Sequence, residues 1–295
     1  MKILITGANG FLGQHLIKRL LDETTHLIIA TGKGEQRTPF QSTSLEYVSL
    51  DLCDGVAVHH LMDMLRPDLV VHCAAMTQAD ECEVNEIDCW NINVTATRFL
   101  LDAAKKTGAR FILLSTDFVF DGAAGPYRES DTANPVSYYG SSKVAAEKSV
   151  MESGLDAAVV RTCLVYGDVV TGTRNNIVTW VKNNLQDGKS IKVVSDQLRT
   201  PTYVEDLSAG IQLLIDKKAS GVYHISGEEL LSPYDMAIAT ADHLGLDKSL
   251  IEKVDASTFS QPAKRPARTG FVIDKAKSEL AFKPLSFKEG LAKMF

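Results

Sequence analysis

The stretch ITGANGFLG (residues 5–13) decides the fold class of this 295-residue chain. The apolar run that leads into it predicts a buried strand, and residues 11–23 have the apolar spacing of an amphipathic helix. Gly7, Gly10 and Gly13 fall between the two elements. Glycines permit a tight turn and let the backbone approach a pyrophosphate, while the helix N-terminus presents N–H donors to it. The strand, turn and helix together predict a dinucleotide-binding loop.

Short apolar runs alternate with helical patterns through the first half of the chain. The apolar runs predict strands at 2–6, 26–30, 45–50, 68–74, 110–115 and 157–165. Helical spacing between them is clearest at 90–108. Strands that are apolar throughout are buried on both faces, which is typical of a parallel sheet covered by helices. The sequence therefore predicts an α/β fold with a doubly wound parallel sheet, the Rossmann arrangement.

The pattern loosens after residue 166. Helices are expected at 175–186, 204–218 and 232–245, a short strand at 221–226, and a Pro-rich basic loop at 261–271. Because this half lacks a complete alternation, we expect it to cap the carboxyl edge of the sheet, where α/β folds bind ligands. The predicted division is a nucleotide-binding domain of residues 1–165 plus 197–226, and a smaller C-terminal substrate-binding α/β region of residues 166–196 plus 227–295.

The bulk composition excludes several classes of partner. The formal net charge of −6 argues against nucleic acid as a general partner. The sequence contains no run of about 18 apolar residues, so no membrane-spanning helix is expected. The N-terminus has no signal-peptide pattern. The five cysteines include no C-x-x-C pair and no accompanying set of metal ligands, which suits a reducing compartment. We expect a cytoplasmic protein without a metal site or membrane contact.

The stretch SYYGSSK (137–143) places two tyrosines ahead of a lysine. Residues four apart share a helix face, whereas residues five apart diverge. This spacing pairs Tyr139, rather than Tyr138, with Lys143. A tyrosine with an ordinary pKa of about 10 needs a neighbouring cation to exchange protons near neutral pH. Lys143 can supply that field and also hold a nicotinamide ribose, so Tyr139 is the expected acid–base residue.

Two further features fit a carbonyl reduction by a nicotinamide cofactor. Ser115 and Thr116, at the end of a predicted strand, offer a hydroxyl that could bind a substrate oxygen. The exit of the second strand carries Thr31, with Lys33 and Arg37 nearby, where an acidic residue would hold the ribose 2′-hydroxyl of NAD. Small and basic groups suit a 2′-phosphate, which favours NADP(H) over NAD(H). The alternative is that both charges are solvated loop residues.

Together these pieces resemble the extended short-chain dehydrogenase/reductase superfamily over nearly the whole chain. The resemblance implies that the cofactor is bound by the loop residues Gly7, Asn9, Gly10, Phe11, Leu12 and Gly13, by Asp51 and Leu52 on the adenine side, and by Ala74 and Ala75 on the nicotinamide side. It also implies that the catalytic residues are Thr116, Tyr139 and Lys143, and that Tyr138 is a packing residue.

Within the superfamily, four stretches are similar to the dTDP-4-dehydrorhamnose reductase family: residues 115–122, 127–148, 196–207 and 265–277. Members reduce the 4-keto group of a nucleotide-linked 6-deoxy sugar. The resemblance implies that Asp117 and Val119 line the sugar site and that Arg199 and Arg265 bind the anionic nucleotide, a role suited to the forked donors of arginine. The alternative for each arginine is a structural ion pair. A homodimer is a family expectation.

Two positions depart from that family, and both lie where substrate identity would be determined. Leu164 occupies the place of a frequent tryptophan, and Thr269 followed by Gly270 occupies the end of an R-P-x-x-S motif. A sugar-nucleotide epimerase that recycles bound NAD(P) is therefore an alternative, whereas Phe118 after Asp117 lacks the glutamate of related dehydratases. A second alternative is a non-catalytic, nucleotide-binding subunit similar in fold to the regulatory subunit of methionine adenosyltransferase.

Overall fold

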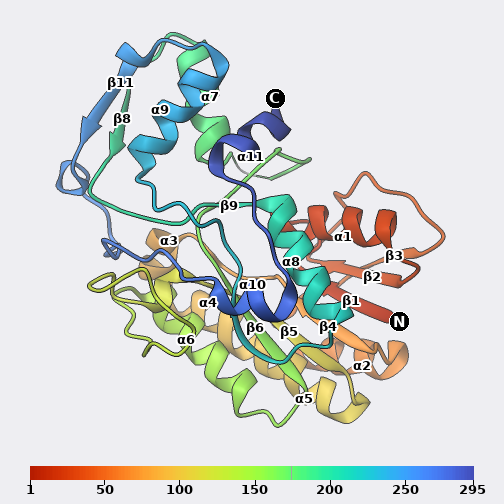
Figure 1. The fold of residues 1–295 in the computed structure, drawn as a ribbon. Helices are drawn as coiled ribbons and strands as arrows, with labels where there is room; N and C mark the ends of the chain where they lie inside the picture. The colour runs from red at the N-terminus through yellow and green to blue at the C-terminus, as the bar shows by residue number, and fades with distance from the viewer. Residues whose placement is uncertain (174) are drawn as a thin grey trace.

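A parallel seven-stranded sheet forms the centre of the molecule (Figure 1). The structure is a computed structural model that describes residues 1–173 and 175–295. In the described chain the strand order is β10-β6-β5-β4-β1-β2-β3. The strands are β1 (Lys2–Thr6), β2 (Leu27–Gly32), β3 (Leu45–Ser49), β4 (Leu69–His72), β5 (Arg110–Thr116), β6 (Ala157–Thr162) and β10 (Gly221–His224). The predicted doubly wound parallel sheet is confirmed.

The order of the strands reverses at β1. From β1 the chain builds β2 and β3 on one side, then crosses over to build β4, β5, β6 and β10 on the other. The carboxyl ends of β1 and β4 are therefore neighbours, with Thr6 in register with His72. Loops that leave two such strands diverge to opposite faces and open a crevice between them, which is the usual ligand position in this architecture.

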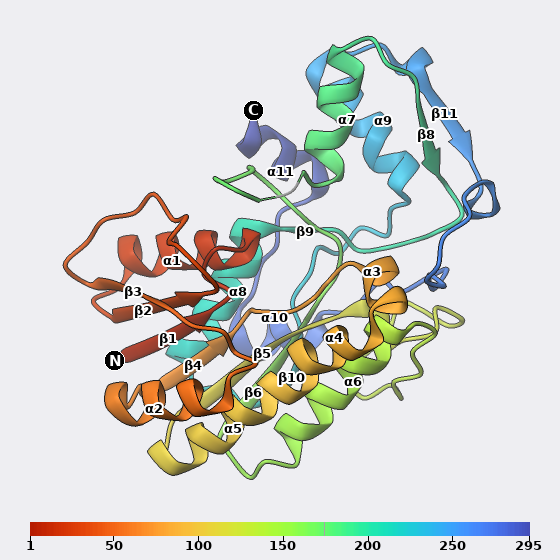
Figure 2. The same ribbon diagram turned by 180° about the vertical axis from the view of Figure 1, so that it is seen from behind.

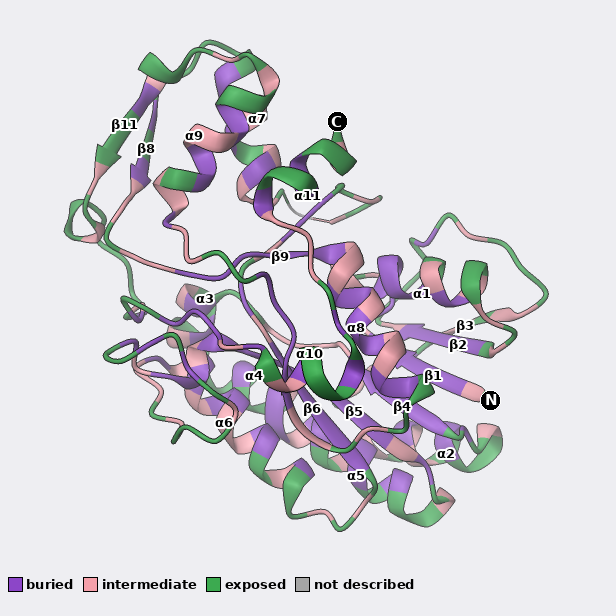
Figure 3. Ribbon diagram, viewed as in Figure 1, coloured by how far each residue is buried: buried purple, intermediate pink, exposed green. Residues whose placement is uncertain are grey.

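Two layers of helices cover the sheet. The face in front in Figure 1 carries α1 (Phe11–Glu23), α8 (Val204–Asp216) and α10 (Asp274–Leu280), and the face in front in Figure 2 carries α2 (Gly55–Leu65), α5 (Ala96–Thr107) and α6 (Tyr138–Met151). Each layer buries one apolar cluster against the strands. Figure 3 shows the resulting pattern, with buried strands between helices that are exposed on their outer faces.

The predicted helix at 90–108 is interrupted in the structure. The short helices α3 (Ala79–Val84) and α4 (Glu86–Trp90) precede a π-helical turn, η1 (Asn91–Thr95), and only then does α5 begin. Within this turn the buried amide of Asn93 accepts from Met76 N at 2.8 Å and donates to Met76 O at 3.0 Å and to Ser142 Oγ at 2.9 Å. The wide turn therefore fixes the loop after β4 against α6.

The second region holds its own apolar cluster beyond the carboxyl edge of the sheet. It contains α7 (Ile177–Gln186), α9 (Pro233–Leu244), α11 (Phe287–Met294), and two-stranded parallel sheets of β8 (Ile191–Val194) with β11 (Ile251–Val254) and of β7 (Val165–Tyr166) with β9 (Thr202–Tyr203). The predicted strand 157–165 is split here, because Leu164 has a φ of 40° and β7 leaves the main sheet to pair with β9. No helix in the described parts of the chain is both long and apolar enough to cross a bilayer.

Residues 271–282 pack differently from the predicted division. Phe271, Ile273, Leu280 and Phe282 are buried in the apolar cluster formed by α1, α8 and the sheet. The helix α10 contacts both α8 and β10. The segment therefore packs with the main sheet, although the predicted division placed it in the C-terminal region.

A buried ion pair joins the second helix layer to the sheet. Glu147 of α6 lies 2.7 Å from Arg161 of β6, and both side chains are 7% exposed. Glu147 also accepts a hydrogen bond of 2.5 Å from Ser115 Oγ at the end of β5. The Arg161 guanidinium lies 5.1 Å from the centre of the Phe120 ring. Burial makes either charge costly without its partner, so the pair fixes α6 relative to two strands.

We expect Glu147→Gln to lower the free energy of unfolding by about 3 kcal/mol, because it leaves the Arg161 charge buried without a carboxylate. Urea denaturation measures the change. The matched control is Lys148→Gln, which breaks an exposed pair with Glu152 at 3.8 Å and should cost less than about 0.5 kcal/mol. Equal stability of the two variants would contradict the role given to the buried pair.

Candidate active site

A cavity of about 520 Å³ lies at the carboxyl ends of β1, β4, β5 and β6. It is lined by Gly7, Gly10, Phe11, Leu12 and Gly13 of the glycine loop, by Ala75, and by Thr116, Asp117, Tyr139, Lys143 and Arg199 among others. A second cavity of about 660 Å³ shares Gly7, Gly10, Cys73 and Ala75 with the first. The two therefore form one groove that runs along the glycine loop, which suits an elongated ligand.

The glycine loop lies against the exit of β4. Gly7 has a φ of 68°, and a Cβ there would lie 2.7 Å from Ala74 N. A Cβ on Gly13 would lie 2.3 Å from Gly7 O, inside the turn itself. Both positions therefore require glycine. Gly7 needs it for its positive φ and its close approach to Ala74, and Gly13 needs it for the tight turn into α1. The floor of the groove is consequently backbone, which exposes N–H groups to a ligand.

The adenine-side cavity gathers most of the predicted cofactor residues. It is lined by Asn9, Lys33, Arg37, Asp51, Leu52, Ala74 and Ala75, besides the shared glycines. Asn9 Oδ1 accepts from Arg37 N at 2.8 Å, and Asn9 Nδ2 donates to Glu35 O at 2.9 Å. These bonds tie the glycine loop to the segment after β2, so the predicted groups for a 2′-phosphate lie beside the loop.

Lys33 and Asp51 form an ion pair of 2.8 Å across this cavity. The hydrogen bond from Lys33 lowers the pKa of Asp51, and the same bond raises the pKa of Lys33. Lys33 is 81% exposed, so this pair is weak and the ammonium can turn to another anion. Thr31 is placed differently from the prediction: it is buried within β2 and lines neither cavity, because the strand continues to Gly32.

The three predicted catalytic side chains line the same cavity. Ser137 caps α6, with its hydroxyl accepting from Gly140 N at 3.2 Å, and Tyr139 and Lys143 follow one turn apart on the buried face. Thr116 is the last residue of β5. Tyr138 turns away and packs against Trp90, with ring centres 6.4 Å apart, in agreement with the spacing.

Burial controls the charges of the catalytic pair. It lowers the pKa of Lys143 to about 8, against the opposing effect of the Glu147 carboxylate. Burial also raises the pKa of Tyr139, and the neighbouring Thr116 hydroxyl opposes that rise. Tyr139 therefore holds its proton in the unliganded site and can donate it to an oxygen that develops negative charge there. The positive charge of Lys143 on the same helix face favours that transfer.

Two of the four predicted substrate residues, Val119 and Arg265, lie outside the catalytic cavity. Val119 is fully buried in the apolar core, because the short helical turn after Thr116 directs it away from the cavity. Arg265 lies 2.7 Å from Asp80 and does not line the catalytic cavity. Asp117 and Arg199 do line it, but they pair with each other at 3.2 Å. Both arginines thus make an ion pair within the protein, and their binding of an anionic nucleotide stays a prediction.

Sequence reasoning missed several residues of the cavity wall. Thr77, Phe118, Thr162 and Leu207 line it without having been expected there. One signal was available for Thr162, since it ends β6 and the carboxyl ends of parallel strands gather at the ligand edge. Leu164 is 37% exposed and also lines the cavity, so the departure from tryptophan alters the wall of the site itself.

Comparisons with known proteins agree with this geometry. Residues 1–295 match the model of the RmlD substrate binding domain. The chain belongs to the RmlD substrate-binding domain family. Its structural neighbours are dTDP-4-dehydrorhamnose reductases and related extended short-chain dehydrogenase/reductase enzymes.

Three relatives illustrate the range of this family. A dTDP-4-dehydrorhamnose reductase from Clostridium acetobutylicum is 31% identical, with a TM-score of 0.86 over 100% of this chain and 98% of that one. The Bacillus anthracis reductase, solved in complex with NADP, is 28% identical, with a TM-score of 0.87 over the same shares. Methionine adenosyltransferase 2 subunit beta of Bos taurus is 35% identical over 262 residues, which are 87% of this chain and 76% of that protein.

We expect Gly7→Ala to weaken NADPH binding by at least about tenfold, because the added Cβ would push the loop away from β4. Titration of NADPH fluorescence measures the affinity. Gly108→Ala is the matched control: Gly108 also has a positive φ, of 75°, but its Cβ would meet no atom within 4 Å. If both variants bound NADPH equally well, the close approach at Gly7 would have no part in cofactor binding.

Proposed function

We propose that the protein is an NADPH-dependent reductase of the 4-keto group of a nucleotide-linked 6-deoxy sugar. The observation that carries this proposal is the meeting of Thr116, Tyr139 and Lys143 with the glycine loop in one cavity. A carbonyl reduction needs a hydride donor, a proton donor and a group that polarises the carbonyl. The loop would bind the hydride donor, and the three side chains supply the other two requirements.

The residues of the groove fit NADP(H). The backbone of the glycine loop and the start of α1 would hold the pyrophosphate. Lys33 and Arg37 would hold the 2′-phosphate, with Asp51 and Leu52 on the adenine side and Ala74 and Ala75 on the nicotinamide side. When bound, NADPH supplies the hydride. The NADP complex of a reductase with the same fold supports this choice, and NAD(H) is the alternative cofactor.

The side chains of the chain itself direct the proton. Tyr139 donates its phenolic proton to the oxygen of the reduced carbonyl, and Thr116 hydrogen-bonds the same oxygen. The ammonium of Lys143 favours the tyrosinate that remains, because an adjacent positive charge stabilises an anion. All three side chains are less than one-tenth exposed, so few waters compete for these hydrogen bonds.

Two other functions remain as alternatives. A non-catalytic nucleotide-binding subunit is favoured by the 35% identity to a methionine adenosyltransferase subunit. Such a subunit would bind NADPH without consuming it. An epimerase would recycle its bound cofactor, so it too would cause no net loss of NADPH. The homodimer implied by the family resemblance and the cytoplasmic location expected from the sequence are part of the proposal, and light scattering of the purified protein tests the dimer.

The direct test of function is the absorbance at 340 nm of NADPH mixed with a dTDP-4-keto-6-deoxy sugar, with NADH compared in parallel. We expect the absorbance to fall only when sugar and protein are both present. Tyr139→Phe should lower kcat by about 1000-fold, because it removes the proton donor. Tyr138→Phe is the matched control and should keep the wild-type rate. Unchanged turnover in Tyr139→Phe would exclude the proposed proton donor.

Turnover should also fall as pH rises above about 8. Because burial lowers the pKa of Lys143 to about 8, its ammonium is present below that pH and is lost above it. Loss of the charge removes the stabilisation of the Tyr139 anion, so we expect kcat to fall by about tenfold per pH unit beyond the pKa. Measurement of kcat from pH 6 to 10 at saturating NADPH tests this. A constant kcat up to pH 10 would exclude an essential role for the Lys143 charge.

A further inference from the structure

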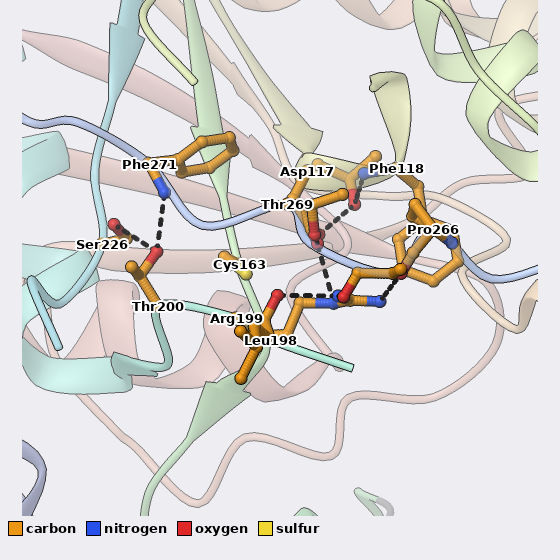
Figure 4. Close-up of polar contacts among 12 residues, drawn as sticks. Asp117, Phe118, Cys163, Leu198, Arg199, Thr200, Ser226, Pro266, Thr269 and Phe271 are labelled. Carbon is orange, nitrogen blue, oxygen red and sulfur yellow. Dashed lines mark hydrogen bonds and ion pairs between the residues drawn. The ribbon is translucent and has the colours of Figure 1, made fainter. Parts of the chain in front are cut away.

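A buried carboxylate joins the catalytic strand to two segments that are distant in the sequence (Figure 4). Asp117 is 3% exposed. Its Oδ2 lies 3.2 Å from Nε of Arg199 and accepts a hydrogen bond from the hydroxyl of Thr269. Its Oδ1 accepts from the hydroxyl of Thr116 at 3.1 Å. One carboxylate thus connects a proposed catalytic residue with two other parts of the chain.

The Arg199 guanidinium is held by protein groups on several sides. Besides Asp117, it donates to the carbonyl oxygens of Leu198 at 2.8 Å, Ala267 at 3.3 Å and Pro266 at 2.6 Å. The side chain is 5% exposed. These bonds use the forked donors of arginine on fixed acceptors. Arg199 therefore acts within the protein and has little capacity left for a substrate anion.

The segment that carries Thr269 is equally fixed. Thr269 N donates to Leu198 O at 3.1 Å, and Leu198 N donates to Ala267 O at 2.7 Å. A Cβ on the following Gly270 would lie 2.5 Å from a methyl carbon of Leu230, so the backbone is closely packed here. Thr269 is fully buried. The position of the Thr269 hydroxyl beside Asp117 is thus set by the fixed backbone and not only by the rotamer of the Thr269 side chain.

The Thr116 hydroxyl has one proton, which both Asp117 and a substrate oxygen can accept. In the structure it donates that proton to Asp117, and Phe118 N donates to its oxygen at 3.3 Å. A carbonyl substrate needs the same proton for its own oxygen. The strength of the hydrogen bond from Thr116 to Asp117 depends on the negative charge at the Asp117 oxygens. A carboxylate whose charge is not compensated by other donors is the stronger acceptor. Arg199 and Thr269 compensate that charge from the opposite oxygen.

We propose that Arg199 and Thr269 are positioning residues that act through Asp117 to set the orientation of the Thr116 hydroxyl. The inference rests on the proposed reduction, in which Thr116 hydrogen-bonds the carbonyl oxygen. With Arg199 and Thr269 in place, the hydrogen bond to Asp117 keeps the Thr116 side chain in the cavity wall. That bond is weak enough for the Thr116 hydroxyl to donate to the substrate oxygen instead. Without Arg199 and Thr269, the Asp117 carboxylate rotates or keeps the hydrogen bond from Thr116. The substrate carbonyl then loses the hydroxyl that polarises it.

The variant Thr269→Val removes the hydroxyl but keeps the shape of the side chain. We expect kcat for the keto sugar to fall by about tenfold, because Asp117 loses a buried hydrogen bond. The KM for NADPH should stay near the wild-type value, since Thr269 does not line the groove. Thr269→Ser restores the hydroxyl and should restore kcat. Arg199→Lys, which keeps a charge but loses the fork, should lower kcat in the same way and serves as the second variant if Thr269→Val does not fold.

Crystal structures of the wild-type protein and Thr269→Val give a readout that needs no turnover. We expect the Asp117 carboxylate to rotate in the variant and the contact between Thr116 Oγ1 and Asp117 Oδ1 to leave hydrogen-bond range. An unmoved contact, wild-type kcat in Thr269→Val, or equal impairment of Thr269→Ser would each overturn the inference. If the wild-type protein does not reduce the sugar, the proposed function fails, and the crystal structures alone decide whether Thr269 positions Thr116.

Discussion

The close approach of two strand exits at Gly7 is the constraint on which the site depends. Because a Cβ at Gly7 would lie 2.7 Å from Ala74 N, the backbones that leave β1 and β4 are in direct contact. Behind them, Thr6 and His72 are joined by a hydrogen bond of 2.7 Å, and His72 is joined to Thr97 at 3.0 Å. The contact fixes the floor of the groove, and the reversal of strand order at β1 opens the groove above it.

Two buried ion pairs fix the carboxyl ends of β5 and β6. Glu147 and Arg161 join α6 to β6, while Asp117 and Arg199 join the end of β5 to the second region. The first pair spans 14 residues and joins consecutive elements, whereas the second spans 82 residues. Since an unpaired buried charge is strongly destabilising, these elements can move apart only at a large cost in free energy. Thr116 lies between the two pairs, which explains how a strand terminus can hold a hydroxyl in one place.

Local patterns predicted the fold and the placement of Tyr139 and Lys143 on one helix face, whereas tertiary contacts determined the rest of the site. Tyr139 and Lys143 lie one helical turn apart, so their shared face follows from spacing alone. The partners of Arg199 and Arg265 are Asp117 and Asp80, which lie 82 and 185 residues away, and no pattern near either arginine indicates them. Thr31 was misplaced because β2 continues to Gly32, so Thr31 lies within the buried strand and not at its exit.

The buried charge of Lys143 fits the proposed proton transfer. Within the described residues no carboxylate pairs with Lys143, and Glu147, the acidic residue one turn away, pairs with Arg161 instead. Burial of an ammonium without such a partner lowers its pKa and disfavours folding, so the position costs stability. A proton transfer through Tyr139 gives the buried charge a use, because the same low dielectric that makes it costly strengthens its effect on the phenolate.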